Sequence, residues 1–435
     1  MNLDKVLYFL NHIKQKVWFY PVLYSIFAAL LVVIIVILDL GILFNIENFT
    51  TPLLLTDIDI GETILGIIAG AFITITTFTF SITMVVLTMY TAQYSPRVVK
   101  NFLTRKDTLQ SFGIFVSGFL YTMLVFVFLS SYPPDTMIIS STIGIIYILV
   151  GLIFFFRFIN SVASYIQASN LIKRLKEISN YEIKIYKERI EDNQIVEKLP
   201  VEEEDQLFKF NSPDDGYIQV LDFKYLAEIA TDYNVDIHFH KVIGQFVSKN
   251  TKIGTINQSK KPLSDQDKED IIKKIANGII IEEERVDQQD FAFTIQKIVE
   301  VALKALSPGI NDPNTAIQCI QVTSLLLRDL SELPAGYLKI EGQDSEGGSL
   351  YIEAIDFEIL LIDTYQQIVN YGLADVKVIL EILKGLQIIK ASASDSSRKS
   401  IMEFAEYLWR KILARDFDRL EVEMLRREKR ELESI

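Results

Sequence analysis

Hydroxyl side chains are frequent in the second apolar run of the chain, which extends from Gly61 to Pro96. When this run is placed on a helix with about 100° between residues, Thr76, Thr79 and Thr83 share one face. Hydrogen-bonding groups on one helix face can line a polar path when several copies surround a common axis. The spacing therefore makes these three threonines candidate pore-lining residues.

The opposite face of the same predicted helix carries a different pattern. Gly66 and Gly70 form a GxxxG pair, and Thr74, Thr77, Ser81 and Thr88 continue the same side. Small residues at this spacing let two membrane helices approach closely, because apolar burial supplies little drive for association inside a bilayer. We expect Gly66 and Gly70 to serve in helix packing.

Other residues that can do chemistry are scattered. His238 and His240 are two residues apart on a predicted strand, so both rings face one side and could bind a metal or respond to pH. No further ligand has a fixed spacing to them, and the acidic runs Glu202–Glu204 and Glu282–Glu284 are typical of solvated faces. Cys319 is the single cysteine, which excludes an intrachain disulfide, and we expect it in a helix core. We find no nucleotide-binding loop, nucleophile elbow or zinc-protease motif, and predict no catalytic residue, cofactor or metal site.

One short segment combines two helix signals. It consists of Ser307, Pro308, Gly309, Ile310, Asn311, Asp312 and Pro313. Gly309 can adopt a positive φ to end the preceding helix, and Asp312 followed by Pro313 is a favourable start for the next. The segment is a structural corner between two helices, or alternatively an anion site at the start of the second helix.

Four apolar runs are long enough to cross the roughly 30 Å of hydrocarbon in a bilayer. They cover approximately residues 21–44, 62–92, 109–131 and 138–160. The segment between the second and third runs is basic, whereas those between the first and second and between the third and fourth are acidic. Because basic segments stay in the cytoplasm, we predict a multi-pass protein of the bacterial cytoplasmic (inner) membrane with both termini inside.

The charge of the chain is divided unevenly. The 435 residues carry a net charge of −13, and basic and acidic residues balance up to residue 170, so the excess acidity belongs to the remainder. An acidic region is repelled by phosphate backbones, and no basic nucleic-acid-binding module occurs. We therefore expect the lipid bilayer and further copies of the chain as partners, and no nucleic acid. The sequence does not identify a small-molecule or ion ligand.

The pattern of elements predicts an α-helical membrane domain followed by an α+β cytosolic domain with a small β unit and a C-terminal helical bundle. We place a four-helix transmembrane domain at residues 1–165, a juxtamembrane helical stalk and linker at 166–212, a small β-rich subdomain at 213–286 and a helical subdomain at 287–435. The stalk helix is expected to continue directly from the fourth apolar run. The last segment, SRKSIMEFAEYLWRKILARDFDRLEVEMLRREKRELES, is expected to form one long helix.

Two stretches carry a family resemblance. They are YSPRVVKNFL, in which Ser95, Pro96 and Arg97 mark the cytoplasmic end of the second helix, and ERVDQQDFAFTIQKIVEVALKALSPGINDPNTA. Together with the acidic-outside and basic-inside layout, they resemble the bacterial predicted-membrane-protein family called domain of unknown function 2254. The resemblance covers nearly the whole chain, and it implies an architecture and a membrane location rather than an activity.

Two functions are compatible with these patterns. The first is an oligomeric channel-like protein in which the second helix presents Thr76, Thr79 and Thr83 to a central path that the cytosolic domain gates. The alternative is a membrane-anchored regulatory or scaffold protein that binds a ligand or a protein through its cytosolic domain. Without a catalytic motif, an enzyme is the weaker hypothesis.

Overall fold

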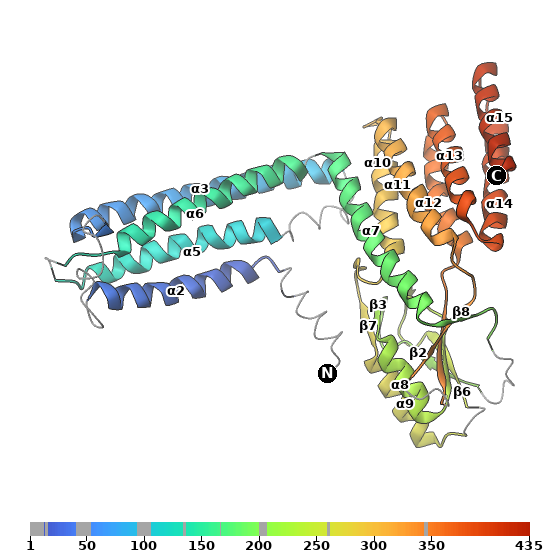
Figure 1. The fold of residues 1–435 in the computed structure, drawn as a ribbon, viewed down its shortest axis with the longest axis horizontal. Helices are drawn as coiled ribbons and strands as arrows, with labels where there is room; N and C mark the ends of the chain where they lie inside the picture. The colour runs from blue at the N-terminus through green and yellow to red at the C-terminus, as the bar shows by residue number, and fades with distance from the viewer. Residues whose placement is uncertain are drawn as a thin grey trace. The chain divides into compact units, whose positions relative to one another are not determined.

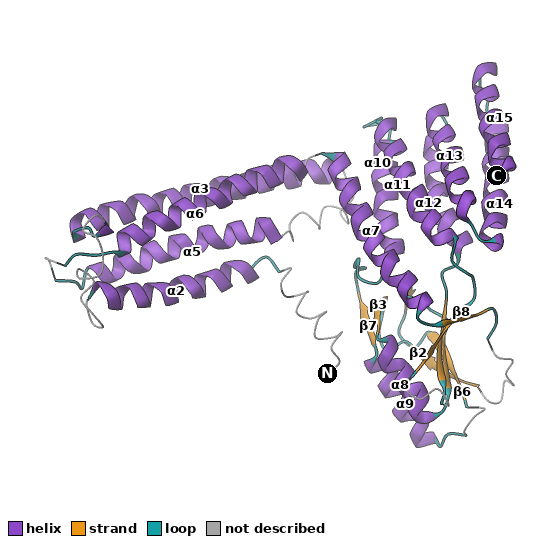
Figure 2. Ribbon diagram, in the orientation of Figure 1, coloured by secondary structure: helices purple, strands orange, loops and turns teal. Residues whose placement is uncertain are grey.

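The structure is a computed structural model that describes residues 13, 16–40, 54–93, 106–133, 136–165, 167–199, 207–258, 262–342 and 347–435. The chain divides into two compact units, Met1–Asn170 and Leu171–Ile435. Figures 1 and 2 show their helices and strands.

The first unit contains four apolar helices that are long enough to cross a membrane. They are α2 (Phe19–Asp39), α3 (Ile58–Gln93), α5 (Lys106–Leu129) and α6 (Ser140–Tyr165), and they lie side by side in Figure 1. In the described part of the chain, the four predicted apolar runs coincide with these helices to within a few residues at the ends, and α3 begins before its run. Helix α5 packs against the other three helices.

Small residues on α5 set the spacing of this bundle. The ring of Phe72 lies 2.3 Å from the position that a Cβ atom would take on Gly118, so α3 and α5 approach closely there. Phe72 and Phe115 are fully buried in the bundle core. At one end of the bundle, the backbones of Thr56 and Ile138 form an antiparallel bridge that joins the segments leading into α3 and α6.

The second unit contains most of α7 (Ala168–Glu191), from Leu171 onward, and continues as a mixed α/β region. A six-stranded sheet has the order β1-β8-β9-β4-β6-β2, and a three-stranded sheet has the order β5-β3-β7. Only the β4–β9 pair is parallel among the described strands. The strands are β1 (Gln194–Val196), β2 (Leu207–Asn211), β3 (Gly216–Leu221), β4 (Asp236–Phe239), β5 (Phe246–Val247), β6 (Lys252–Asn257), β7 (Ile279–Glu282), β8 (Tyr337–Glu341) and β9 (Ser349–Glu353).

Helices make up the rest of this unit. They are α8 (Phe223–Tyr233), α9 (Asp265–Asn277), α10 (Phe291–Ala305), α11 (Pro313–Ser331), α12 (Phe357–Gly372), α13 (Val376–Ser392), α14 (Asp395–Leu413) and α15 (Arg419–Ser434). Each of these eight begins at an Asp or Ser whose side chain accepts a hydrogen bond from the first turn. At the start of α9, Ser264 and Asp267 form a reciprocal capping box. In Figure 1, α10 to α15 form a group beside the sheets.

Three expectations differ from the structure. The expected last helix is divided, because α14 ends at Leu413 and α15 begins at Arg419 with a capping box at Asp418. The expected continuous stalk is interrupted, since α6 ends at Tyr165 and Gln167 is not helical. Strands β8 and β9, within the range predicted to be helical, pair with each other, and β9 also pairs with β4. Their long separation from β4 along the chain gives no local signal for this pairing.

Candidate functional site

Two faces of α3 differ in their surroundings. Thr79 and Thr83 have exposed fractions of 0% and 5% inside the bundle, and Thr76 is partly buried on the same side. The Thr76 hydroxyl donates to the Phe72 carbonyl at 2.6 Å, and that of Thr83 donates to the Thr79 carbonyl at 2.8 Å. The three candidate pore-lining threonines therefore face the other helices of their own chain. Their role in a path stays a prediction.

The opposite face of α3 points away from the bundle. Its small and hydroxyl residues are all exposed; we call them the outward stripe, and they are Thr63, Gly66, Gly70, Thr74, Thr77, Ser81 and Thr88. A Cβ atom added to Gly66 or Gly70 would have no neighbour within 4 Å. The GxxxG pair thus makes no close helix contact within the chain, and its predicted packing role is open to another molecule.

The segment from Ser307 to Pro313 forms a corner between α10 and α11. Asp312 is the N-cap of α11, where its carboxylate accepts hydrogen bonds from the amide and hydroxyl of Thr315, and Pro313 is the first helical residue. The left-handed residue of the corner is Asn311, with φ of 51°, and the expectation that Gly309 has positive φ is wrong. Pro308, Gly309 and Ile310 are exposed at the tip of this corner, while Ser307 is partly buried. Ser95, Pro96 and Arg97 lie outside the described residues.

A partly buried ion pair that sequence reasoning missed lies just before α10. Arg285 donates from Nε and Nη2 to the two carboxylate oxygens of Asp290, at 2.9 Å each, and from Nη1 to Gln296 at 3.1 Å. Asp290 is also the N-cap of α10. Burial raises the pKa of Asp290, against the opposing charge of Arg285. Gly244, at φ of 85°, passes so close that a Cβ there would meet this pair.

The same region ties α7 to α10 through charged and hydroxyl groups. Lys297, 3% exposed, forms an ion pair with Asp287, and the backbone amide of Gln289 donates to the Glu182 carboxylate at 2.9 Å. Burial raises the pKa of Glu182. The Ser179 hydroxyl of α7 donates to Thr294 of α10 at 2.7 Å. Within the second unit, these contacts fix one face of α7 against α10 and the loop before it.

A row of polar side chains crosses the six-stranded sheet. The register of the strands aligns Lys339, Tyr351, His238 and Thr255 in consecutive positions. Burial lowers the pKa of His238 to about 4, so the ring is neutral near pH 7, and it contacts Tyr351 edge-on. His240 lies beyond β4 and shares a hydrogen bond of 2.9 Å with Thr255. In the described part of the chain, no group of three or more His, Cys, Asp or Glu side chains could hold a metal.

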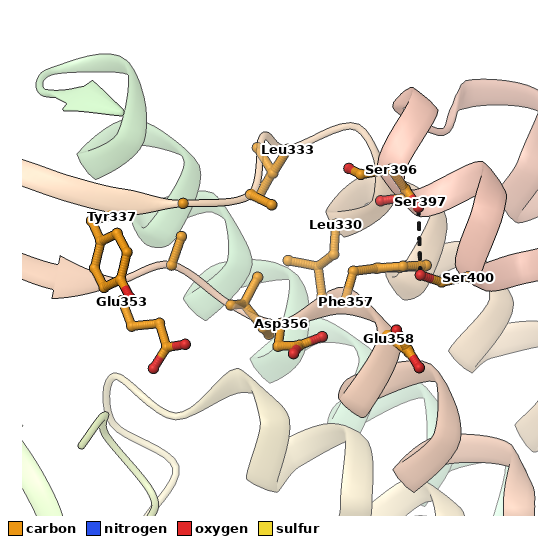
Figure 3. A pocket seen from close by; sticks show the side chains of 14 residues that line it. Leu330, Leu333, Tyr337, Glu353, Asp356, Phe357, Glu358, Ser396, Ser397 and Ser400 are labelled. Atoms are coloured by element: carbon orange, nitrogen blue, oxygen red, sulfur yellow. Dashed lines mark hydrogen bonds between the residues drawn. The ribbon is translucent and has the colours of Figure 1, made fainter. Parts of the chain in front are cut away.

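A pocket opens where the sheet meets the helices (Figure 3). It encloses about 230 Å³ between the end of α11, the ends of β8 and β9 that lead to the helices, and the first turns of α12 and α14. Carboxylates and hydroxyls line it alongside Leu330, Leu333 and Phe357, and no lysine or arginine is among its described lining residues. Its polar residues are Tyr337, Glu353, Asp356, Glu358, Ser396, Ser397 and Ser400. Two further sequence candidates lie outside this pocket and apart from each other. Cys319 is buried in α11, and Glu282–Glu284 are exposed.

These features define a membrane protein with four apolar helices and a mixed helical and sheet region. The chain belongs to the family described as predicted membrane protein (DUF2254), whose sequence pattern matches residues 14–387. It is 23% identical, over 346 residues, to a protein of Mycobacterium bovis and to one of Mycobacterium tuberculosis strain H37Rv, both described as uncharacterized. The matches cover 77% of this chain and 65% of each relative, so the chain spans less than two thirds of their length. No solved structure matches.

Proposed function

We propose that the chain is a homo-oligomeric, channel-like protein of the bacterial cytoplasmic membrane whose subunits meet along the outward stripe of α3. The exposed glycines and hydroxyls of this stripe carry the proposal. One bundle of four helices is too small to enclose a path, so a path requires further copies around an axis.

The surroundings of the outward stripe support this assembly. Large apolar residues flank it on both sides, including Ile67, Ile73, Phe78 and Val85, each more than half exposed. Lipid is a suitable neighbour for those residues, whereas Gly66 and Gly70 offer a surface on which a second helix can approach closely. The hydroxyls of Thr74 and Ser81 donate to the carbonyls of Gly70 and Thr77 at 2.9 Å each. Their oxygens keep acceptor capacity toward a neighbouring subunit.

The proposed orientation places both termini in the cytoplasm. The basic segment between α3 and α5 and the acidic residues at the opposite end of the bundle support it by the positive-inside rule. In this orientation the bridge between Thr56 and Ile138 faces outward from the cell.

Recordings from the purified full-length chain in planar bilayers with symmetric KCl test the channel proposal. We expect discrete conductance that decreases when Thr77→Leu and Ser81→Leu replace stripe hydroxyls by bulky apolar groups. Val85→Leu, on the lipid-facing flank of the same helix, is the matched control and should leave the conductance unchanged. No conductance under any ion gradient or membrane tension would contradict the channel function.

A second candidate function is that of a membrane-anchored regulatory protein that binds a ligand through its second unit. The pocket in Figure 3 favours it, because carboxylates and hydroxyls there stand beside an apolar wall. Thermal unfolding of the full-length chain with a library of polar metabolites would test it. A stabilising compound should lose its effect in a Ser400→Trp variant, whose ring fills the pocket, and equal stabilisation of both proteins would exclude this site.

A further inference from the structure

A carboxylate is buried at one end of the membrane bundle. Asp39, the last residue of α2, has an exposed fraction of 5%. Its Oδ1 atom accepts a hydrogen bond of 2.8 Å from the amide of Ile139, directly before α6 begins. One oxygen of this carboxylate therefore helps to join α2 to the N-terminal end of α6, where the positive end of the helix dipole lies.

The second oxygen of this carboxylate and two nearby hydroxyl oxygens are buried and make no hydrogen bond to the described protein. They are Asp39 Oδ2, Tyr132 Oη and Ser140 Oγ. Ser140 is fully buried and Tyr132 is 9% exposed. Both residues interact with the Asp39 carboxylate. The amide and the hydroxyl of Ser140 approach it, although the hydroxyl falls short of good hydrogen-bond geometry. Buried polar atoms in native proteins are nearly always satisfied, so three together call for a partner.

The charge of Asp39 also lacks a partner among the described residues, since no Lys, Arg or His side chain lies within 4.0 Å of it. The amides at the start of α6 and the dipole of that helix offset only part of the cost of burying a carboxylate. Ionisable residues inside membrane helices are expensive, and they normally mark a functional site.

We propose that Asp39 Oδ2, Tyr132 Oη and Ser140 Oγ bind a hard monovalent cation of the Na⁺ or K⁺ class. The donors are all oxygen atoms, which favours hard cations over metals that prefer nitrogen or sulfur. A single carboxylate balances one positive charge, whereas divalent sites in proteins gather several carboxylates. The cation offsets the charge of Asp39 and links α2, the end of α5 and the start of α6.

This site is independent of the outward stripe, because it lies inside one bundle and needs no second copy. The Tyr121 hydroxyl of α5 donates to the Ser140 carbonyl at 2.8 Å, which holds the start of α6 in place beside Asp39. The antiparallel bridge of Thr56 with Ile138 closes the same end of the bundle. Hydrogen bonds of neighbouring residues thus hold the segments that carry the site in place.

Thermal unfolding of the detergent-purified full-length chain tests the proposal at constant ionic strength, with N-methylglucamine chloride exchanged for NaCl, KCl or LiCl. A ligand that binds the folded state raises the unfolding midpoint in a saturable manner. We expect a rise of several degrees that saturates with one of these cations. The rise should be absent in Asp39→Asn and retained in Asp59→Asn, which changes an exposed carboxylate near the same end.

Two further variants cover the case in which Asp39→Asn does not fold. Tyr132→Phe and Ser140→Ala each remove one oxygen and keep the carboxylate, and both should raise the half-saturating cation concentration at least several-fold. The proposal is overturned if the midpoint depends on no cation, if Asp39→Asn responds as the native chain does, or if both oxygen-deletion variants keep the native half-saturation. A midpoint that changes only with pH would identify a proton as the occupant, and would equally overturn it.

Discussion

Arg285 and Asp290 form a two-point ion pair in which the same carboxylate also starts a helix. Both oxygens of Asp290 accept from the guanidinium at 2.9 Å, and Oδ1 additionally accepts from the Phe293 amide of α10 at 2.9 Å. The side chain of Asp290 is 3% exposed. Asp290 therefore joins the loop that carries Arg285 to the start of α10, and the backbone at Gly244 packs directly against it.

Removing Arg285 should be strongly destabilising. In Arg285→Ala the Asp290 charge stays buried without its main partner, which costs about 3 kcal/mol or more. Arg285→Lys should recover only part of this, because an ammonium cannot make the two parallel hydrogen bonds. Urea unfolding of the second unit within the full-length chain measures the loss. Arg328→Ala, at a pair with Asp329 that is 40% and 33% exposed, is the control and should cost under about 1 kcal/mol.

The neutral His238 predicts a pH dependence of stability. Its folded pKa is about 4 against an ordinary value of 6.5, so between these values the unfolded chain binds a proton that the folded chain does not. Stability should therefore fall as the pH decreases from 6.5 to 4, by at most about 3 kcal/mol from this residue. His238→Gln should reduce the slope in the same interval. Comparing the two proteins cancels the effects of His240, Glu182 and Asp290, and equal slopes would contradict the assignment.

The corner between α10 and α11 predicts different effects for neighbouring residues. Asp312→Ala removes the N-cap of α11 and should cost about 1 kcal/mol in unfolding free energy. Asn311→Val should cost about as much, because a β-branched residue disfavours the left-handed conformation. Gly309→Ala should change stability by less than about 0.5 kcal/mol, since its φ is not positive and no atom lies within 4 Å of the added Cβ. Chemical denaturation of the three variants measures these differences, and a costly Gly309→Ala would contradict the described geometry.

Two glycines of the membrane bundle should respond in opposite ways. Gly118→Leu places a side chain into the ring of Phe72 and should unfold or rearrange the bundle, seen as a lowered thermal midpoint in detergent. Gly70→Leu projects outward and should leave that midpoint unchanged, while reducing the fraction of oligomer in size-exclusion chromatography with light scattering. Equal effects of the two substitutions on the midpoint would contradict the outward position of Gly70.

Local patterns in the sequence predict much of this fold. The apolar runs give four membrane-length helices, and α8 and α12 each start after an aspartate, Asp222 or Asp356, a residue type that favours the N-cap position. The break between α14 and α15 was missed, although Asp418 three residues before Glu421 has the spacing of a capping box. Periodicity alone cannot show where a polar helix is interrupted.

Long-range pairing explains what the sequence does not reveal. Tyr351 and His238 become neighbours only through the parallel pairing of β4 with β9, which follows from no local spacing. On α3, periodicity separates the hydroxyls correctly into two faces but does not tell which face packs within the chain. The structure turns Thr79 and Thr83 inward and Gly66 and Gly70 outward.

Disulfide cross-linking in native membranes tests the assembly along the outward stripe most directly. In a Cys319→Ser background, which lacks any other cysteine, Thr77→Cys should form a covalent dimer of the chain upon mild oxidation. Thr79→Cys, which is turned inward on the same helix, and Ile146→Cys, which is 52% exposed on α6, should not. Absence of a cross-link at Thr77, or an equal yield at Ile146, would contradict the account.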